Sequence, residues 1–329
     1  MQGFETKFRD FPDYIIGITK EIWEDRGIAT LHKYYSDDVI VRSPTSVFLG
    51  NERVIGATMA TLAEFPDRTL LGQDVIWSGT PEAGMLSSHR LLSTATHLGD
   101  GAYGCATGKK LIYTILADCH AINNQINDEW LIRDQGAIVR QMGWDPQEFA
   151  RDQIAREGGP ETCPRPLTPA NDVPGPYTGH GNDNDWGQYH AGILHSIMAA
   201  DFTIIPRTYD RAAELHYPGG HVGYSHGDAD RFWLSLRAAF PDATFTLHPQ
   251  IGRDDPMMPP RSAIRWSLHG THSGWGAFGA PSGAQVYILG ISHAEFGPFG
   301  PDGRGLRREY TLFDETAVWK QILLHTGAL

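Results

Sequence analysis

Two stretches of this chain establish its architecture: FPDRTLLGQDVIWSGTPEAGMLSSHRLLSTATH at residues 65–97 and FPDATFTLHPQIGRDDPMMPPRSAIRWSLHGTH at residues 240–272. Both begin with Phe-Pro-Asp, carry an arginine 25 positions later and end in Thr-His seven positions further on. The two copies are offset by 175 residues at each of these points, without a gap. Because such a register preserves which strand positions share a face, we interpret the chain as an internal duplication.

The match continues toward the end of each copy. Thr107-Gly108 corresponds to Ser282-Gly283 at the same offset, and after a small insertion residues 129–134 correspond to residues 309–314 at an offset of 180. Six prolines, interleaved with glycine and asparagine, occupy residues 158–184, a composition that interrupts helices and strands. We therefore expect three parts: a first domain at 1–145, a linker at 146–184 and a second domain at 185–329.

The composition is that of a globular protein, with 41% hydrophobic and 20% charged residues. The formal net charge of -12 argues against a nucleic-acid partner, because phosphate backbones require clustered Lys and Arg. No apolar stretch approaches the roughly 20 residues that span a bilayer, and the polar N-terminus lacks a signal core. We expect a cytoplasmic protein without a membrane partner. The three cysteines form no CxxC pair, so neither a disulfide framework nor a thiolate metal site is predicted.

The pattern of apolar residues places helices early and strands late in each copy. Residues 11–26 and 185–200 have helical spacing, as do the stretches that precede each Phe-Pro-Asp. After Phe-Pro-Asp the period becomes two: Ile264, Trp266 and Leu268 alternate with polar side chains. This order predicts an α+β unit with an antiparallel sheet, rather than a parallel βαβ sheet.

Several motifs in this order resemble those of a known family. They are Phe-Pro-Asp, then Arg-Trp-x3-Gly-Thr-His-x-Gly at residues 265–274, Gly-x-Pro-Ser-Gly at 279–283, and Glu-Trp/Tyr-x3-Asp at the end of each copy. The chain resembles the SnoaL-like polyketide cyclases, a branch of the nuclear transport factor 2-like superfamily. The resemblance implies two cone-shaped α+β barrels, each a curved antiparallel sheet wrapped by helices around a hydrophobic pocket.

The resemblance also implies a chemistry. In the family's cyclases a late acidic residue in the pocket acts as acid/base in an intramolecular aldol closure, assisted by a histidine, without metal or organic cofactor. Glu129 and Glu309 match that acid position, and each precedes an aromatic residue, Trp130 or Tyr310, expected to wall the pocket. The same fold hosts isomerases, dehydratases and non-catalytic binding modules, so it does not by itself define the reaction.

A histidine and a carboxylate stand two positions apart on a late strand of each copy. Asp118 precedes His120 in the first copy, and His293 precedes Glu295 in the second. Residues i and i+2 share a strand face, so either pair can present an acid and a base to one cavity. The gap-free register aligns Asp118 with His293, whereas a shift of two aligns His120 with His293. Both registers stay open, as does the alternative of a polar pair outside any pocket.

Other matched positions complete the set of candidates. His97 and His272 are candidates for donating to a substrate oxygen, with a structural role at a strand end as the alternative, and Trp266 is a candidate pocket wall. Arg90 and Arg265 lie on the strand face opposite these histidines, and we favour a role in bracing the two copies against each other.

We therefore expect a cofactor-independent enzyme that abstracts a proton from a small carbonyl-containing substrate, leading to cyclisation, isomerisation or dehydration. The alternative is a non-catalytic ligand-binding or assembly module. A third hypothesis, a serine hydrolase, rests on the G-x-S-x-G pattern around Ser225, but a turn, rather than a parallel strand, precedes it. We expect no metal, an internal pseudo-dimer of the two copies, and a homodimer as a further option. Which copy is active stays open.

Overall fold

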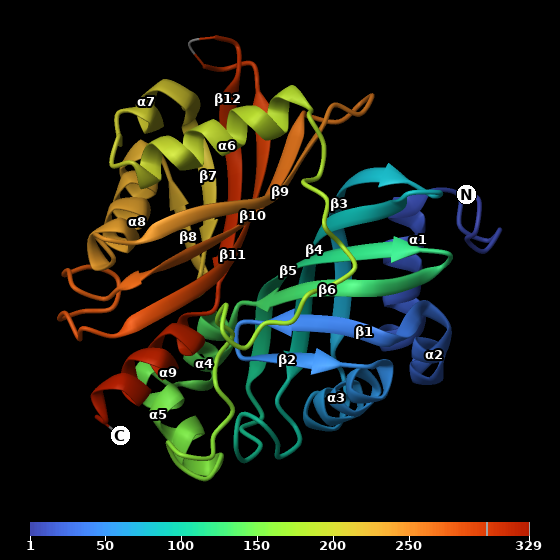
Figure 1. Ribbon diagram of the computed structural model, residues 1–329, viewed down its shortest axis with the longest axis horizontal. Helices are drawn as coiled ribbons and strands as arrows, with labels where there is room; N and C mark the ends of the chain where they lie inside the picture. Colours follow the sequence, from blue (N-terminus) through green and yellow to red (C-terminus); the bar gives the residue numbers. More distant parts are fainter. Residues whose placement is uncertain (301, 329) are drawn as a thin grey trace.

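The computed structural model describes residues 1–300 and 302–328. It contains two six-stranded sheets of the same strand order, β2-β1-β6-β5-β4-β3 and β8-β7-β12-β11-β10-β9. Each sheet is curved and carries its helices mainly on one face, and the two halves lie side by side (Figure 1). The predicted pair of α+β units is confirmed.

The elements of the two halves correspond one to one over most of their length. The first half contains α1 (Phe11–Thr19), η1 (Lys20–Glu24), η2 (Ile28–Thr30), α2 (Leu31–Tyr34), β1 (Tyr35–Ser43), β2 (Ser46–Leu49), α3 (Asn51–Glu64), β3 (Thr69–Thr80), β4 (Gly84–Thr96), β5 (Lys110–Ile122), β6 (Gln125–Arg133) and α4 (Gln135–Met142). After α5 (Pro146–Arg156), the second half contains α6 (Asp185–Met198), α7 (Ile204–Thr208), β7 (Tyr209–Tyr217), β8 (His221–Tyr224), α8 (His226–Ala239), β9 (Thr244–Arg253), β10 (Arg261–Thr271), β11 (Gln285–Gly297), β12 (Gly305–Phe313) and α9 (Glu315–Thr326).

One strand pair in each sheet departs from the expected antiparallel arrangement. β1 pairs with β6 in parallel, and β7 pairs with β12 in parallel, whereas the other pairs are antiparallel. The hairpins β1–β2 and β7–β8 lie between the helices of each half in the sequence. The predicted order of helices first and strands later is therefore incomplete. β2 and β8 are only four residues long and mostly solvent-accessible, and β1 and β7 each contain two adjacent exposed residues that break the alternation, so all four carry little periodic signal.

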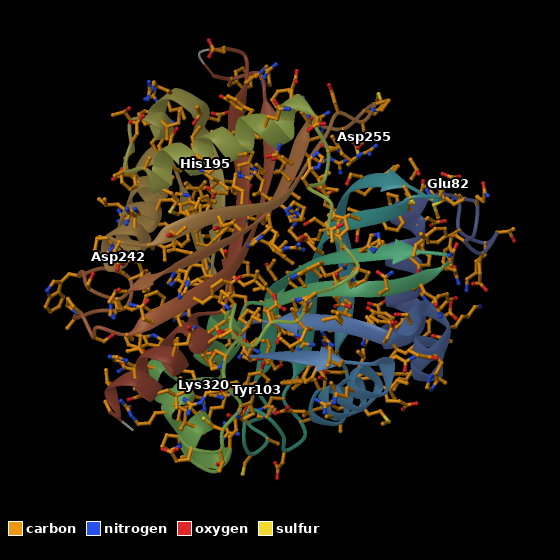
Figure 2. The ribbon with its side chains drawn as sticks, viewed as in Figure 1. Glu82, Tyr103, His195, Asp242, Asp255 and Lys320 are labelled. Carbon is orange, nitrogen blue, oxygen red and sulfur yellow. The ribbon has the colours of Figure 1, made fainter. Side chains whose placement is uncertain are left out.

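The repeated Phe-Pro-Asp and Thr-His motifs are joined by hydrogen bonds. The Asp67 carboxylate accepts from the Thr96 backbone N–H at 2.7 Å and from its hydroxyl at 2.6 Å. Asp242, labelled in Figure 2, accepts from Thr271 in the same way at 2.8 and 2.6 Å. The motif thus ties the start of the first long strand to the end of the next, which accounts for its strict spacing in both copies.

The segment between the halves begins with α5, as its sequence suggested, and α5 packs against α9 at the base of the molecule (Figure 1). Residues 157–184 then run along both halves without forming a helix or a strand; their one bridge joins Gly181 to Gln250. None of the helices in the described ranges is long and apolar enough to cross a membrane.

Reciprocal contacts join the outer faces of the two sheets. The Arg265 guanidinium carbon lies 3.4 Å from the centre of the Trp130 ring, and the Arg90 guanidinium carbon lies 3.5 Å from the centre of the Tyr310 ring. These are matched positions of the duplication, so each half contributes the same arginine and the same aromatic position. Such reciprocity is the pattern of an isologous interface, here within one chain. Arg90 and Arg265 both contact the opposite half, as expected of a brace.

Candidate functional site

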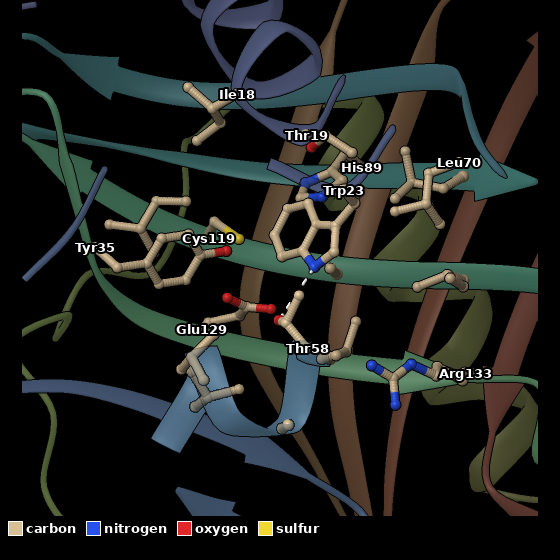
Figure 3. A pocket seen from close by; sticks show the side chains of 18 of the residues that line it. Ile18, Thr19, Trp23, Tyr35, Thr58, Leu70, His89, Cys119, Glu129 and Arg133 are labelled. Carbon is tan, nitrogen blue, oxygen red and sulfur yellow. Dashed lines mark hydrogen bonds between the residues drawn. The ribbon is translucent and has the colours of Figure 1, made fainter. Parts of the chain in front are cut away.

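The first half encloses a cavity of about 90 Å³ between its sheet and the helices above it (Figure 3). That volume is several times the roughly 10–15 Å³ that one water needs by this measure. Ile15, Ile18 and Trp23 close the cavity from α1 and η1, and α3 adds Val54 and Thr58. The walls are mainly apolar, and a small set of polar side chains faces inward: Thr19, Tyr35, Thr58, Arg68, His89, Cys119, Glu129 and Arg133. Apolar walls around a few polar groups are typical of small-molecule sites.

Glu129 is the buried carboxylate of this cavity. Its place on β6 turns the side chain toward the helices, together with Leu131 and Arg133 of the same strand face. Burial raises the pKa of Glu129 from the ordinary 4.5 to about 7, although the neighbouring Tyr35 hydroxyl and the positive charge of Arg133 both lower it. A carboxyl group with this pKa is close to half-ionised at neutral pH, so it can accept a proton and return it.

His89 on β4 is the second titratable group of the site. It is buried, and desolvation lowers its pKa to about 4, so the imidazole is neutral at neutral pH. Its Nδ1 lies 3.2 Å from Ser87 Oγ, which in turn lies 3.4 Å from the Cys119 carbonyl oxygen. Because the carbonyl can only accept, Ser87 donates its single proton there and accepts from Nδ1–H. This tautomer leaves Nε2 of His89 as a hydrogen-bond acceptor.

The corresponding space in the second half is filled with aromatic rings. At the matched offset, Trp233 stands where the first half has Thr58, and Trp266 stands where it has Leu91. Both tryptophans have no solvent exposure. A Cβ at Gly290 would lie 2.2 Å from the Trp266 ring, so the absence of a side chain there makes room for it. The second half is therefore packed solid where the first is hollow.

Glu309 holds the position equivalent to Glu129 but is enclosed by hydroxyl groups. Tyr209 and Tyr217 each donate to its Oε2 at 2.9 Å, and Thr311 donates to its Oε1 at 2.8 Å. Burial raises the pKa of Glu309 and these hydrogen bonds oppose that effect. Its oxygens accept hydrogen bonds and two buried tryptophans fill the adjacent core, so Glu309 has a structural environment, whereas Glu129 lines the cavity of the first half.

The four residues of the two acid/His pairs lie between the sheets and not in the cavity. Asp118 accepts from Arg265 at 2.9 Å, and His293 Nε2 lies 2.8 Å from Ser88 Oγ of the first half. Glu295 is held by arginines of both halves: Arg308 donates a hydrogen bond to it at 3.2 Å, and Arg90 forms an ion pair with it at 3.7 Å. His120 Nδ1 lies 2.7 Å from the Asn127 side-chain oxygen. Asp118, His293 and Glu295 thus contact the opposite half, whereas His120 lies beside Tyr177 of the linker.

Strand pairing settles the register that the sequence left open. Ser88 pairs with Asp118 in the first sheet, and Ala263 pairs with His293 in the second. Both partners are offset by 175, so the gap-free alignment of Asp118 with His293 holds. The position that holds an acid in the first half, Asp118, therefore holds a histidine in the second, His293.

The other candidate residues are also outside the cavity. His97 and His272 are fully buried, with Nδ1 3.1 Å from Thr107 Oγ1 and 2.9 Å from Ser282 Oγ respectively, which is the structural alternative considered above. Trp130 and Tyr310 stack on the interface arginines. Trp266 donates to Ser292 Oγ at 3.0 Å inside the filled core. None of these side chains lines the cavity of the first half.

Strand alternation in the sequence could have identified some of the cavity residues that were not predicted. Once Arg90 is assigned to the face between the copies, its neighbour His89 must point the opposite way, because adjacent strand residues alternate. The same alternation means that an aromatic directly after Glu129 cannot wall the pocket that Glu129 faces. By this rule Arg133, four positions beyond Glu129, shares its face. Thr58 and Arg68 carried no comparable signal, since helix and turn residues reach the cavity only through tertiary packing.

The surroundings of Ser225 do not support the serine hydrolase hypothesis. Ser225 is exposed, and the strand before it, β8, is antiparallel to β7, whereas a nucleophile elbow follows a parallel strand. The hydrogen bonds found in the described ranges include none between the Ser225 hydroxyl and a histidine.

No protein-family model matches the sequence, and no curated protein matches it. Solved structures do. IdmH from Streptomyces antibioticus is 23% identical with a TM-score of 0.35, over 41% of this chain and 100% of its own. A SnoaL-like polyketide cyclase from Agrobacterium tumefaciens is 18% identical with a TM-score of 0.34, over 40% and 96%. A nuclear transport factor 2-like superfamily protein from Salmonella enterica is 13% identical with a TM-score of 0.32, over 39% and 91%. Each of these matches covers about 40% of this chain.

Proposed function

We propose that the first half is a cofactor-independent acid/base enzyme for a small carbonyl-containing substrate, and that the second half is its non-catalytic support. The observation that carries the proposal is Glu129, a buried carboxyl with a pKa of about 7 that lines the cavity of the first half. Its counterpart Glu309 faces a filled core. The cyclisation, isomerisation or dehydration that follows proton transfer depends on the substrate.

In the proposed reaction, the ionised Glu129 removes a proton from the carbon next to a carbonyl group. The apolar walls keep water away, so the carboxylate is poorly solvated and more basic than in solution. Nε2 of the neutral His89 accepts a hydrogen bond from a substrate hydroxyl and so orients the substrate. Protonated Glu129 then returns the proton to carbon or to a leaving hydroxyl group.

The alternative of a non-catalytic module applies to the second half only, as an assembly module. Trp233 and Trp266, both fully buried, occupy the space a ligand would need there. We propose that this half covers the outer face of the first half's sheet, in the manner of the second subunit of a dimer.

Hydrogen–deuterium exchange tests the proposal without knowledge of the natural substrate. Phenylacetone and ethyl acetoacetate are incubated in D₂O with the wild-type protein, and loss of the α-proton signal is followed by ¹H NMR. We expect exchange faster than in buffer, rising as the pH increases through about 7 because Glu129 must be ionised to act as the base.

Glu129→Gln should reduce that rate by at least about 100-fold, the usual contribution of a general base. Glu309→Gln is the matched control at the equivalent position and should retain the rate. Exchange that survives in Glu129→Gln at the wild-type rate, or that is never faster than in buffer for either ketone, contradicts the proposal.

A further inference from the structure

Two arginines line the cavity of the first half without an ion-pair partner. The ion pairs found among residues 1–300 and 302–328 include neither Arg68 nor Arg133. Arg68 is 6% exposed, and its Nε donates to the Tyr113 hydroxyl at 3.2 Å, a neutral acceptor. Nε of Arg133 is buried and makes no hydrogen bond to any described residue. Arg68 is buried and Arg133 is partly buried. Buried charges are ordinarily paired, so two such cations outside the ion pairs of the described residues are an unusual feature.

Arg133 lies at the boundary between two cavities. A second, outer cavity of about 220 Å³ adjoins the first, and both are bounded by Arg133, Leu131 and Phe48. Arg133 therefore lies where the inner cavity meets the outer one. Figure 3 shows its guanidinium and the Glu129 carboxylate projecting from β6 on either side of Trp23 and Thr58 in this view.

The duplication supplies a comparison within the same chain. At the matched offsets, Ala243 stands where the first half has Arg68, and Phe313 stands where it has Arg133. The filled half thus lacks both arginines, although it keeps the carboxylate, as Glu309. If the arginines served only to stabilise the fold, the second copy would be expected to need them as well. They occur in the half that has room for a ligand.

We propose that the substrate of the first half carries a carboxylate group, which Arg133, assisted by Arg68, binds at the mouth of the inner cavity. The inference rests on the proposed function for the reacting end of the substrate. The inner cavity is lined by two guanidinium groups and one carboxyl, Glu129, which leaves one positive charge that a single carboxylate would balance. Glu64, which lines the outer cavity, is already engaged by His97 and by the backbone N–H groups of residues 102 and 103. The planar fork of a guanidinium matches a carboxylate with two parallel hydrogen bonds.

The spacing along β6 adds a constraint on substrate shape. Glu129 and Arg133 are four strand positions apart, which separates their backbones by about 13 Å. The substrate's carboxylate therefore lies well away from the carbon that loses its proton. An elongated acid, with the carboxylate at one end and an activated C–H beside a carbonyl at the other, fits this arrangement.

Binding of a matched pair of probes tests the inference independently of catalysis. Isothermal titration calorimetry at pH 6 compares 3-phenylpropanoate with 3-phenylpropanamide, which differ only in the charge of the head group. We expect the wild-type protein to bind the carboxylate at least tenfold more tightly. Arg133→Gln should abolish that preference, and Arg133→Lys, which keeps the charge without the fork, should retain part of it. Arg53→Gln, an exposed position on the outer side of α3, is the control and should behave as wild type.

The Glu129→Gln variant separates this inference from the proposed function. It should bind the carboxylate as tightly as wild type or more tightly, because a nearby negative charge is removed, although its exchange activity is lost. Equal affinity for the acid and the amide overturns the carboxylate assignment even if exchange activity is present. Tighter binding of 2-phenylethylphosphonate at pH 8 than of the carboxylate also overturns it, in favour of a phosphate-type group. Correct folding of each variant is verified by circular dichroism.

Discussion

Replacing Glu129 with glutamine should make the protein more stable at alkaline pH, at the expense of activity. The reason is the pKa of about 7 that burial gives this carboxyl, against 4.5 for an exposed glutamate. Because the folded-state pKa is raised, the stability associated with the protonated form is fully present below pH 4.5 and is lost as the pH rises through 7. Glutamine has nearly the same shape and does not ionise.

The magnitude follows from the difference between the two pKa values. About 2.5 pH units at 1.36 kcal/mol per unit correspond to about 3 kcal/mol in total. Most of it, about 2.5 kcal/mol, is lost between pH 5 and pH 8, where both forms can be studied. Glu129 is only 7% exposed, so solvent screening takes little from this figure.

Urea denaturation monitored by tryptophan fluorescence at pH 5, 6, 7 and 8 provides the measurement. The unfolding free energy of Glu129→Gln minus that of wild type should increase by about 2.5 kcal/mol over this range. Glu82→Gln, at the exposed turn between β3 and β4 (Glu82 is labelled in Figure 2), is the control. Its unfolding free energy should change with pH in parallel with that of the wild type. If the Glu129→Gln and wild-type curves are parallel from pH 5 to pH 8, the buried carboxyl does not ionise near neutrality and its role as a base is refuted.

Three further outcomes are expected. Asp118→Asn leaves the Arg265 guanidinium without its buried counter-ion and should lower the unfolding free energy by about 3–5 kcal/mol in urea titrations; a loss below about 1 kcal/mol would show that the pair contributes little. Thr58→Trp should fill the first cavity as Trp233 fills the second, so that ketone exchange falls to the buffer rate while the circular dichroism spectrum is retained. His89→Leu should gain up to about 3 kcal/mol relative to wild type as the pH falls from 6.5 to 4, because the lowered pKa of His89 makes wild-type stability decline over that range; parallel denaturation curves at pH 7 and pH 4.5 would contradict this.

The energetics of the two halves explain why one of them can hold reactive groups. The second half places its aromatic side chains, including Trp233 and Trp266, in one continuous core. In the first half, the apolar residues divide into separate clusters around the cavity. A hollow with a buried carboxyl and unpaired arginines reduces stability, and the well-packed partner half, joined through paired charges and stacked rings, offsets that cost.

The duplication, the α+β class and the equivalence of Glu129 with Glu309 could all be predicted from the amino-acid sequence. These follow from local patterns: a repeat with constant spacing, a period of two along each strand, and Asp134 and Asp314 as helix caps after the last strands. Each such signal is contained in one short segment, so it can be recognised without knowing what packs against it.

Which face of each sheet lines a cavity became clear from the packing of the folded chain. Alternation divides a strand into two sets of residues, but the helices that cover one set and the second sheet that covers the other are distant in sequence. Asp118 and Glu129 are both buried acids on paired strands, yet Asp118 pairs with Arg265 of the other half and Glu129 lines the cavity. Likewise, the packing of α3 and α8 on their sheets shows that Thr58 lines a cavity and that Trp233 fills the corresponding space. Burial by non-local partners, rather than local pattern, made one half a candidate enzyme and the other its support.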